Sequence, residues 1–278
     1  MYKRQVVKIL KRNVTQVVGR FEKSRNFGFV IPIDDTIEDI YISKKNSANI
    51  KNGQVVQVKI EKYPTENNKA EGKIIQIIGN SNDINIDAKS LYISYGLDKL
   101  EKFNESVRKE VESIPQNVLA IEKKNRIDRT NERVYTIDAA DAKDLDDAVS
   151  VKKQSDGTFL LSVYIADVSH YVKENTALDK EAIARGTSIY IPGRVIPMLP
   201  KELSNGICSL NAGVERLALG VDILISKNGD VINSQVFKAI IKVTKKMSYD
   251  KVYKVITNNE DDELKEEYGN YKDDLMNM

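Results

Sequence analysis

The sequence predicts a small antiparallel β-barrel, then a helical connector, then a larger α+β domain. Short β-branched runs separated by turn-forming segments fill the first 80 residues. Apolar residues at helical spacing follow, and from Arg133 onward strand-like and helix-like segments alternate. The 278 residues are enough for two domains, each of which can bury its own core.

The barrel is predicted from five strand-like runs of this kind, for which the OB-fold is the leading candidate. They are VTQVVGRF (14–21), NFGFVI (26–31), DIYIS (39–43), QVVQVKI (54–60) and GKIIQII (72–78). An earlier run, RQVVKIL (4–10), has no partner in this count. We therefore interpret residues 1–13 as the remnant of a preceding barrel and 14–80 as the barrel itself.

The helical connector is predicted over residues 81–130. Phe103, Val107 and Val111 recur at helical spacing, and Pro115 ends that stretch. Residues 131–278 then form the α+β domain, with strands in RVYTID, DAVSV, FLLSVYIADV, LALGVDILIS and VINSQVFKAII and a helix over 178–185. The acidic stretch 260–267 is interpreted as a solvated face or loop. The chain stops at YKDDLMNM, inside helical sequence without a capping signal, so we expect it to be truncated.

Charge is unevenly distributed along the chain. Residues 1–80 hold 15 Lys and Arg against 8 Asp and Glu, whereas residues 131–278 hold 19 against 24. A basic module can hold a polyanion, and an acidic module can hold metal cations. Ordinary surface charge explains the same numbers equally well.

Composition excludes several classes of protein. Hydrophobic residues make up 41% and charged residues 30%, which fits a globular chain, and no apolar run is long enough to span a bilayer. The basic start lacks the apolar core of a signal peptide. The single cysteine, Cys208, fits a reducing compartment, so the cytoplasm is the expected location. The single histidine, His170, argues against a His-rich zinc site or a Ser-His-Asp triad.

The segment TIDAADAKDLDDAVSV (136–151) packs five aspartates into ten residues between two strand-like runs. Carboxylates this close repel one another unless a cation neutralises them. Mg²⁺ takes hard oxygen ligands and keeps waters for substrate phosphates, and two such ions about 4 Å apart can cleave a phosphodiester. Two other interpretations exist. A solvated acidic loop is favoured by residue counting alone, whereas a calcium loop of the EF-hand kind requires a spacing that is absent here.

This segment closely resembles the catalytic signature of the ribonuclease R / ribonuclease II (RNB) exoribonuclease family. The downstream segments YIADVSHYV (164–172) and LDKEAIARGTSIYIPGRVIPMLPKELSNGICSLN (178–211) resemble that family too. The resemblance runs from about Val14 to the end. It implies a cold-shock-like barrel followed by an RNB catalytic domain, and processive hydrolysis of single-stranded RNA from the 3′ end to nucleoside 5′-monophosphates.

The resemblance also assigns roles to residues. The four metal-site aspartates fall on Asp138, Asp144, Asp146 and Asp147, with Mg²⁺ as the cofactor and Mn²⁺ as an alternative. Asp146 and Tyr190 are named as catalytic. Tyr190 corresponds to a tyrosine that stacks on the RNA 3′ end, although packing alone would suggest a half-buried strand residue. Asp141 is left out of the site, and Asp167 is expected to make a structural hydrogen bond. Single-stranded RNA is the expected partner, and structured RNA is a further expected substrate. No membrane and no obligate protein partner are expected.

The segments 21–32 and 39–43 resemble the two nucleic-acid motifs of cold-shock domains. Side chains alternate along a strand, so Phe27 and Phe29 share one face, which Tyr41 extends. Bases stack on such aromatics at roughly 1–3 kcal/mol each. Four basic residues are expected to follow the phosphates: Arg20, Lys23, Arg25 and Lys44. The alternative is that one or both phenylalanines face the barrel core, and Ser43 stands where cold-shock proteins often have a histidine.

This chain departs from the family in length. The family's phosphate-contacting arginine and a further RNA-binding barrel have no counterpart here. Two hypotheses therefore stay open, a hydrolytic exoribonuclease and an RNA-binding protein that no longer cuts. We expect residues 1–278 alone to bind RNA weakly and to degrade it little or not at all.

Overall fold

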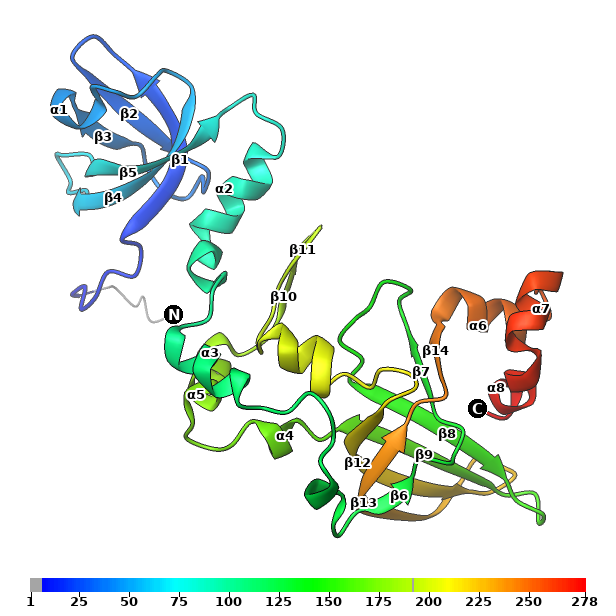
Figure 1. The fold of residues 1–278 in the computed structure, drawn as a ribbon. Helices are drawn as coiled ribbons and strands as arrows, with labels where there is room; N and C mark the ends of the chain where they lie inside the picture. The colour runs from blue at the N-terminus through cyan, green and yellow to red at the C-terminus, as the bar shows by residue number, and fades with distance from the viewer. Residues whose placement is uncertain (1–6, 192) are drawn as a thin grey trace, which may run out of the picture. The chain divides into compact units, whose positions relative to one another are not determined.

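A computed structural model describes residues 7–191 and 193–278 and divides the chain into two compact units (Figure 1). The first unit extends to Lys102, and the second runs from Phe103 to Met278. Within the described residues, no helix has the length and apolar character that a membrane crossing requires.

The first unit is a closed barrel with strand order β1-β2-β3-β5-β4, whose strands are labelled in Figure 1. Its strands are β1 (Gln16–Lys23), β2 (Phe27–Pro32), β3 (Ile40–Ser43), β4 (Gln54–Lys62) and β5 (Glu71–Asn80), with the short helix α1 (Lys44–Ser47) after β3. These confirm the five predicted runs. The prediction of an antiparallel barrel holds for every pair except β3 and β5, which are parallel and close the barrel.

Side chains along each strand point alternately into the barrel core and toward its outer surface. Phe21, Val30, Ile40 and Ile42 are fully buried in its core, whereas Phe27 and Phe29 stay half-exposed on the other face of β2. Gly28 lies between these two rings. A Cβ atom at Gly28 would lie 2.2 Å from the Phe21 ring, so this position admits no side chain.

The predicted connector is divided between the two units. Helices α2 (Ile86–Ser94) and η1 (Leu97–Leu100) belong to the barrel unit, whereas α3 (Glu105–Glu112) and η2 (Ala120–Lys123) belong to the second. Val107 and Val111 of α3 pack in a cluster with α5 (Ala177–Arg185) and the sheet of the second unit. Of the run 4–10, residues 4–6 lie outside the described residues, and residues 7–10 form no strand. Their origin in a preceding barrel stays a prediction.

The second unit contains a seven-stranded sheet of order β14-β7-β8-β9-β12-β13-β6. Its strands are β6 (Ile127–Arg129), β7 (Tyr135–Asp138), β8 (Asp147–Lys153), β9 (Phe159–Ala166), β12 (Glu215–Ile225), β13 (Val231–Lys242) and β14 (Lys245–Ser248). The edge strands β6 and β14 pair in parallel with their neighbours. A separate two-stranded ribbon consists of β10 (Ile189–Ile191) and β11 (Arg194–Ile196).

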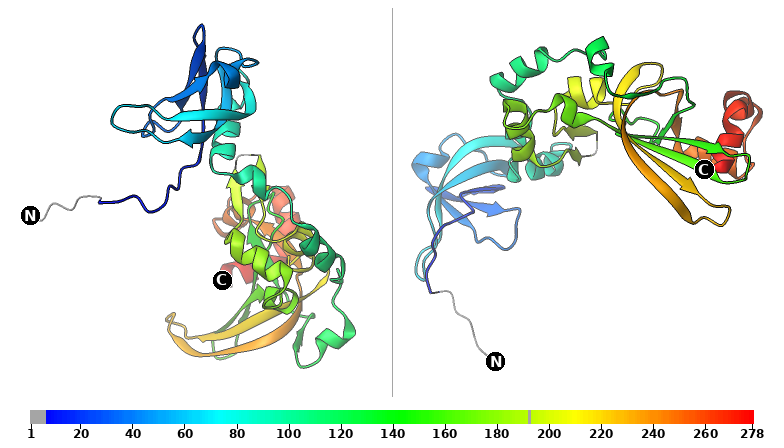
Figure 2. Two further views of the ribbon diagram at one scale, coloured as in Figure 1. Left: turned by 90° about the vertical axis from the view of Figure 1, so that its left-hand side faces the viewer. Right: turned by 90° about the horizontal axis from the view of Figure 1, so that it is seen from below.

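Helices pack at two places on this sheet (Figures 1 and 2). One group is α3, α4 (Val168–Tyr171), α5 (Ala177–Arg185) and the kinked turn η3 (Glu202–Ile207), which share a core with β12 and β13. The other group is α6 (Tyr249–Ile256), α7 (Asp262–Tyr268), η4 (Gly269–Tyr271) and α8 (Lys272–Asn277), which packs against Tyr135 of β7 and Met247 of β14.

The acidic side chains between Asp261 and Glu267 are exposed, which confirms the solvated face expected for the stretch 260–267. Most of it forms α7, whose first turn is capped by the Asp261 side chain accepting from the Leu264 amide. Leu264 and Tyr268 are buried against the sheet edge. The helix under this solvated face is determined by the two buried residues at helical spacing, and the charges alone do not distinguish it from a loop.

Candidate metal and RNA sites

An acidic loop, residues 139–146, connects β7 to β8 in the second unit. Asp138 is the last residue of β7 and Asp147 the first of β8. Because β7 and β8 are antiparallel neighbours, the end of one strand lies beside the start of the next. The sheet therefore holds Asp138 and Asp147 at the two ends of a short loop that also carries Asp144 and Asp146.

Electrostatics show that these carboxylates influence one another. Burial raises the pKa of Asp138, and the charge of Asp147 raises it further, while Lys246 opposes the shift. Burial also raises the pKa of Asp146, with Asp144 and Asp147 adding to it. In addition, Oδ2 of Asp138 is buried without a hydrogen-bond partner. A bound cation would relieve all three penalties.

The donor chemistry of the loop fits a hard cation such as Mg²⁺ or Mn²⁺, because every proposed ligand is a carboxylate oxygen. In the described part of the chain, however, no three Asp, Glu, His or Cys side chains are grouped as a metal site. The four predicted ligands are thus brought into one loop region, without their oxygens converging on one point.

Tyr190 joins the same region from the β10–β11 ribbon. Its side chain is 64% exposed, and its hydroxyl donates a hydrogen bond to Oδ2 of Asp144. This hydrogen bond is the main reason that the pKa of Tyr190 rises to about 12. The two residues line a cleft of about 620 Å³. Other residues lining it are Lys143, Arg194, Lys201, Ser204 and Asn205.

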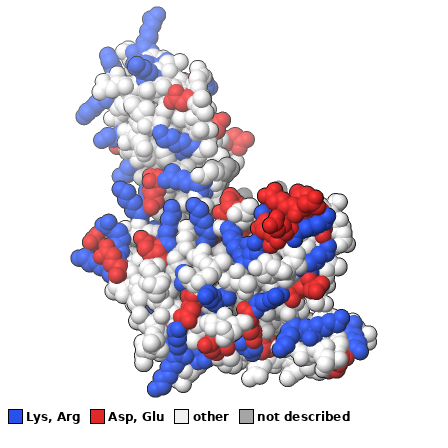
Figure 3. All heavy atoms as spheres, turned by 45° about the vertical axis from the view of Figure 1, so that its right-hand side comes forward, with Lys and Arg blue, Asp and Glu red and all other residues white. Residues whose placement is uncertain are grey.

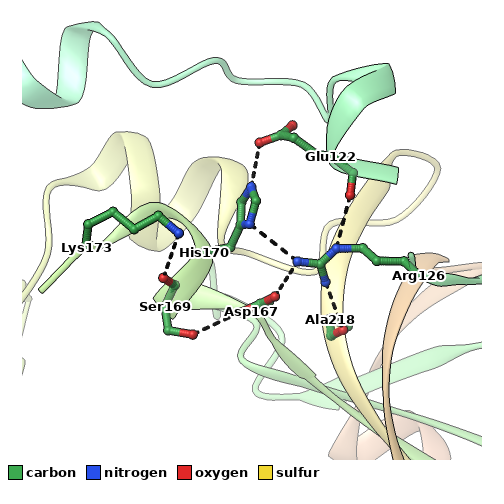
Figure 4. Close-up of polar contacts among 7 residues, drawn as sticks. All are labelled: Glu122, Arg126, Asp167, Ser169, His170, Lys173 and Ala218. Carbon is green, nitrogen blue, oxygen red and sulfur yellow. Dashed lines mark hydrogen bonds and ion pairs between the residues drawn. The ribbon is translucent and has the colours of Figure 1, made fainter. Parts of the chain in front are cut away.

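Asp167 makes the structural interaction expected of it (Figure 4). Its carboxylate accepts from Nη2 of Arg126 at 2.6 Å, and both side chains are almost completely buried. Nε and Nη1 of Arg126 donate to the carbonyls of Glu122 and Ala218, and Nε2 of His170 lies 2.8 Å from Oε1 of Glu122. The single histidine thus belongs to a network that ties the segment after η2 to the sheet.

The barrel carries an aromatic cluster on its outer face. The ring centroids of Phe27 and Phe29 are 5.6 Å apart, and those of Phe29 and Tyr41 are 5.9 Å apart. The register explains this arrangement, since Phe29 pairs directly with Tyr41 across β2 and β3. Nζ of Lys69 lies 5.3 Å from the Phe29 ring centroid, a contact that the sequence did not predict because Lys69 lies in a loop.

The four predicted phosphate contacts of the barrel differ in their surroundings. Arg20 forms an ion pair with Glu22, and Nζ of Lys23 donates to the carbonyl of Ile50. Arg25 is exposed in the turn before β2, and Lys44 is exposed at the start of α1. Figure 3 shows Lys and Arg side chains spread over the barrel with few acidic ones among them, whereas acidic side chains gather in a patch on the second unit.

Comparison with known proteins identifies the family. The RNB domain family matches residues 126–278, which is more than half of the chain and contains the acidic loop, Asp167 and Tyr190. The chain belongs to the RNB family. The cold shock domain family matches residues 29–100, from β2 to η1. Both results confirm the resemblance seen in the sequence and the predicted fold class.

Individual relatives of this RNB protein are considerably longer. Ribonuclease R of Thermotoga maritima is 42% identical over 274 residues, covering 98% of this chain and 38% of that protein. Mycoplasma genitalium RNase R, solved in complex with double-stranded RNA, matches with a TM-score of 0.75 and 29% identity, covering 94% of this chain and 46% of the other. Its complex with ribose methylated single-stranded RNA gives the same TM-score at 28% identity, with coverage of 93% and 41%.

A more distant likeness concerns the fold alone. Yeast Ssd1, described as a pseudonuclease, matches with a TM-score of 0.71 at 17% identity, covering 90% of this chain and 33% of that one. The chain therefore spans less than half the length of each of these proteins.

Proposed function

We propose that this RNB chain forms part of a metal-dependent 3′-to-5′ exoribonuclease that hydrolyses single-stranded RNA to nucleoside 5′-monophosphates. The observation that carries the proposal is the set of four aspartates at the β7–β8 junction, in which Asp138 and Asp146 have raised pKa values and one oxygen of Asp138 is buried without a partner. RNA bound to a solved relative supports the choice of substrate.

In this proposal Asp138, Asp144, Asp146 and Asp147 would hold two Mg²⁺ or Mn²⁺ ions. Such ions activate a water molecule and neutralise charge on the leaving oxygen of a phosphodiester. The Tyr190 ring would stack on the 3′-terminal base, for which its exposed position in the ribbon is suitable. Phe27, Phe29 and Tyr41 would stack on bases upstream, while Arg20, Lys23, Arg25 and Lys44 follow the phosphates.

We place the action of this chain in the cytoplasm, where single-stranded and structured RNA substrates are found. The buried free thiol of Cys208 is consistent with a reducing compartment.

A second candidate function is RNA binding without cleavage. It is favoured by the observation that the acidic side chains of the described residues do not converge into a metal site. In that case the barrel would hold RNA, and the carboxylates would be a remnant of a catalytic site.

Labelled single-stranded RNA distinguishes the two functions. The 278-residue chain should release little or no nucleotide, because the much longer relatives can make further phosphate contacts. A chimera in which this chain replaces the corresponding segment of the Thermotoga maritima relative should release nucleoside 5′-monophosphates stepwise with Mg²⁺ or Mn²⁺. Low doses of a zinc-selective chelator should change nothing. A folded chimera that binds RNA but releases no nucleotide would support the binding function.

The double substitution Phe27→Ala/Phe29→Ala tests the barrel surface. Each lost stack should cost roughly 1–3 kcal/mol of RNA binding. Both rings are half-exposed, so the fold of the barrel should persist. Affinity for a single-stranded oligonucleotide is measured by fluorescence anisotropy on the whole chain, with circular dichroism to check folding. Unchanged affinity in a folded variant would remove these rings from the RNA interface, whereas an unfolded barrel would assign them to the core.

A further inference from the structure

The backbone of the acidic loop is held by hydrogen bonds from residues that lie far away in the sequence. The amide of Ala166 in β9 donates to the carbonyl of Asp146 at 3.0 Å, and the amide of Leu210 donates to the carbonyl of Leu145 at 2.9 Å. The Leu145 side chain is 1% exposed and packs in the core of the sheet. The loop therefore has a fixed backbone, although its aspartates carry like charges.

Ser209 has a particular place among these contacts. Its fully buried hydroxyl donates to the carbonyl of Lys143 at 2.8 Å and accepts from the amide of Leu145 at 3.1 Å. One hydroxyl thus joins the peptide groups on both sides of Asp144. These two peptide groups set the direction of the Cα–Cβ bond of Asp144. The Ser209 hydroxyl therefore fixes the direction in which the Asp144 side chain leaves the backbone.

Two cationic side chains support this arrangement. Nε of the buried Arg216 donates to the carbonyl of Ser209 at 2.9 Å, which holds the serine itself. Nζ of Lys246 in β14 donates to the carbonyls of Ala140 and Ala142, which precede Asp144 in the loop. Lys246 thus holds the first half of the loop, while Ser209 holds the two peptide groups that flank Asp144.

We propose that Ser209 is a positioning residue that orients Asp144 for cation binding. This inference rests on the proposed function, because it assumes that Asp144 is a ligand. Contacts that orient metal ligands without touching the metal typically change affinity by about 10- to 100-fold when they are removed. Ser209→Ala deletes one oxygen atom and removes no carboxylate from the loop.

The test is direct binding of Mn²⁺ to the 278-residue chain, measured without RNA by the electron paramagnetic resonance signal of the free ion. Ser209→Ala should raise the Kd for Mn²⁺ by about 10- to 100-fold. Ser162→Ala is the matched control, since this buried serine donates to Asp222 at 2.5 Å, away from the acidic loop. It should lower thermal stability and leave the Kd unchanged. If Ser209→Ala does not fold, Ser209→Cys should give an intermediate Kd, because a thiol is a weak donor.

The outcomes separate this inference from the proposed function. Asp144→Asn should weaken Mn²⁺ binding in any case. If wild type binds no Mn²⁺, or Asp144→Asn binds it as tightly as wild type, the proposed metal site is wrong. If Asp144→Asn weakens binding while a folded Ser209 variant binds like wild type, the metal site stands and the role of Ser209 is overturned. Equal weakening by Ser162→Ala and Ser209→Ala would also overturn it, since that result indicates a general loss of rigidity.

Discussion

Asp146→Asn should reduce metal-dependent RNA hydrolysis by at least about 10³-fold while RNA affinity changes little. Asparagine keeps the shape of the side chain and removes its charge, so one ligand for the proposed cations is lost. Metal ions supply several kcal/mol of charge stabilisation to phosphodiester cleavage, and 1.36 kcal/mol corresponds to a tenfold rate. RNA affinity should persist because the aromatic cluster and its basic neighbours belong to the other unit.

The measurement is nucleotide release by the chimera, beside a binding assay with the same RNA. Asp141→Asn is the matched control, because Asp141 is an exposed carboxylate in the same loop and is outside the proposed ligand set. It should retain most of the activity. Near-normal hydrolysis by Asp146→Asn would remove this residue from the metal site, and equal losses in both variants would point to net charge instead of coordination.

Thermal stability in the absence of metal provides an independent test of the environment of Asp146. Burial raises the pKa of Asp146, and the charges of Asp144 and Asp147 raise it further, so the ionised form of Asp146 is disfavoured in the folded state. Without metal at neutral pH, Asp146→Asn should therefore melt at the same temperature as wild type or a few degrees higher. A clear loss of stability would show that the carboxylate makes a favourable contact, contrary to the proposal.

Asp167→Asn should destabilise the second unit by about 3–5 kcal/mol. The substitution leaves the Arg126 guanidinium buried without its carboxylate, and an unpaired buried charge carries a penalty of about this size. Replacing both members, as Arg126→Met/Asp167→Leu, should destabilise less than the single change. Urea unfolding followed by hydrogen exchange in β9 and β12 reports on this unit specifically. A loss of less than about 1 kcal/mol of stability would mean that water solvates the Arg126 guanidinium once the carboxylate is gone.

The pH dependence of this contribution has a definite sign. Burial works against ionisation of Asp167, but the hydrogen bond and charge of Arg126 outweigh it and lower the pKa of the carboxyl. A lowered pKa means that the stabilisation is present above the ordinary aspartate range near 4 and is lost as the pH falls through the folded-state value. Wild type should therefore lose stability below about pH 4, and Asp167→Asn should lose less of it there.

What the sequence determined by itself is local in character. Short β-branched runs between turn-forming segments predicted the five barrel strands. Strand alternation predicted the shared face of Phe27 and Phe29, because side-chain direction follows from the backbone of a single strand. The acidic cluster was visible for the same reason, since all four proposed ligands fall within ten residues. The match to the RNB family confirmed the family resemblance that this cluster suggested, whereas the ligand roles stay a prediction.

Other contacts join residues far apart in the chain, and only the folded structure shows them. Ser209 and Lys246 meet the acidic loop across more than 60 residues, and Arg126 meets Asp167 across 41. The edge strand β14, which carries Lys246, is four residues long and pairs in parallel with β7, so it has no hairpin signal in the sequence. The role of a hydroxyl or an ammonium group depends on the partner that it contacts in the folded chain. Sequence periodicity does not predict that partner, because periodicity reports only on residues near one another in the sequence.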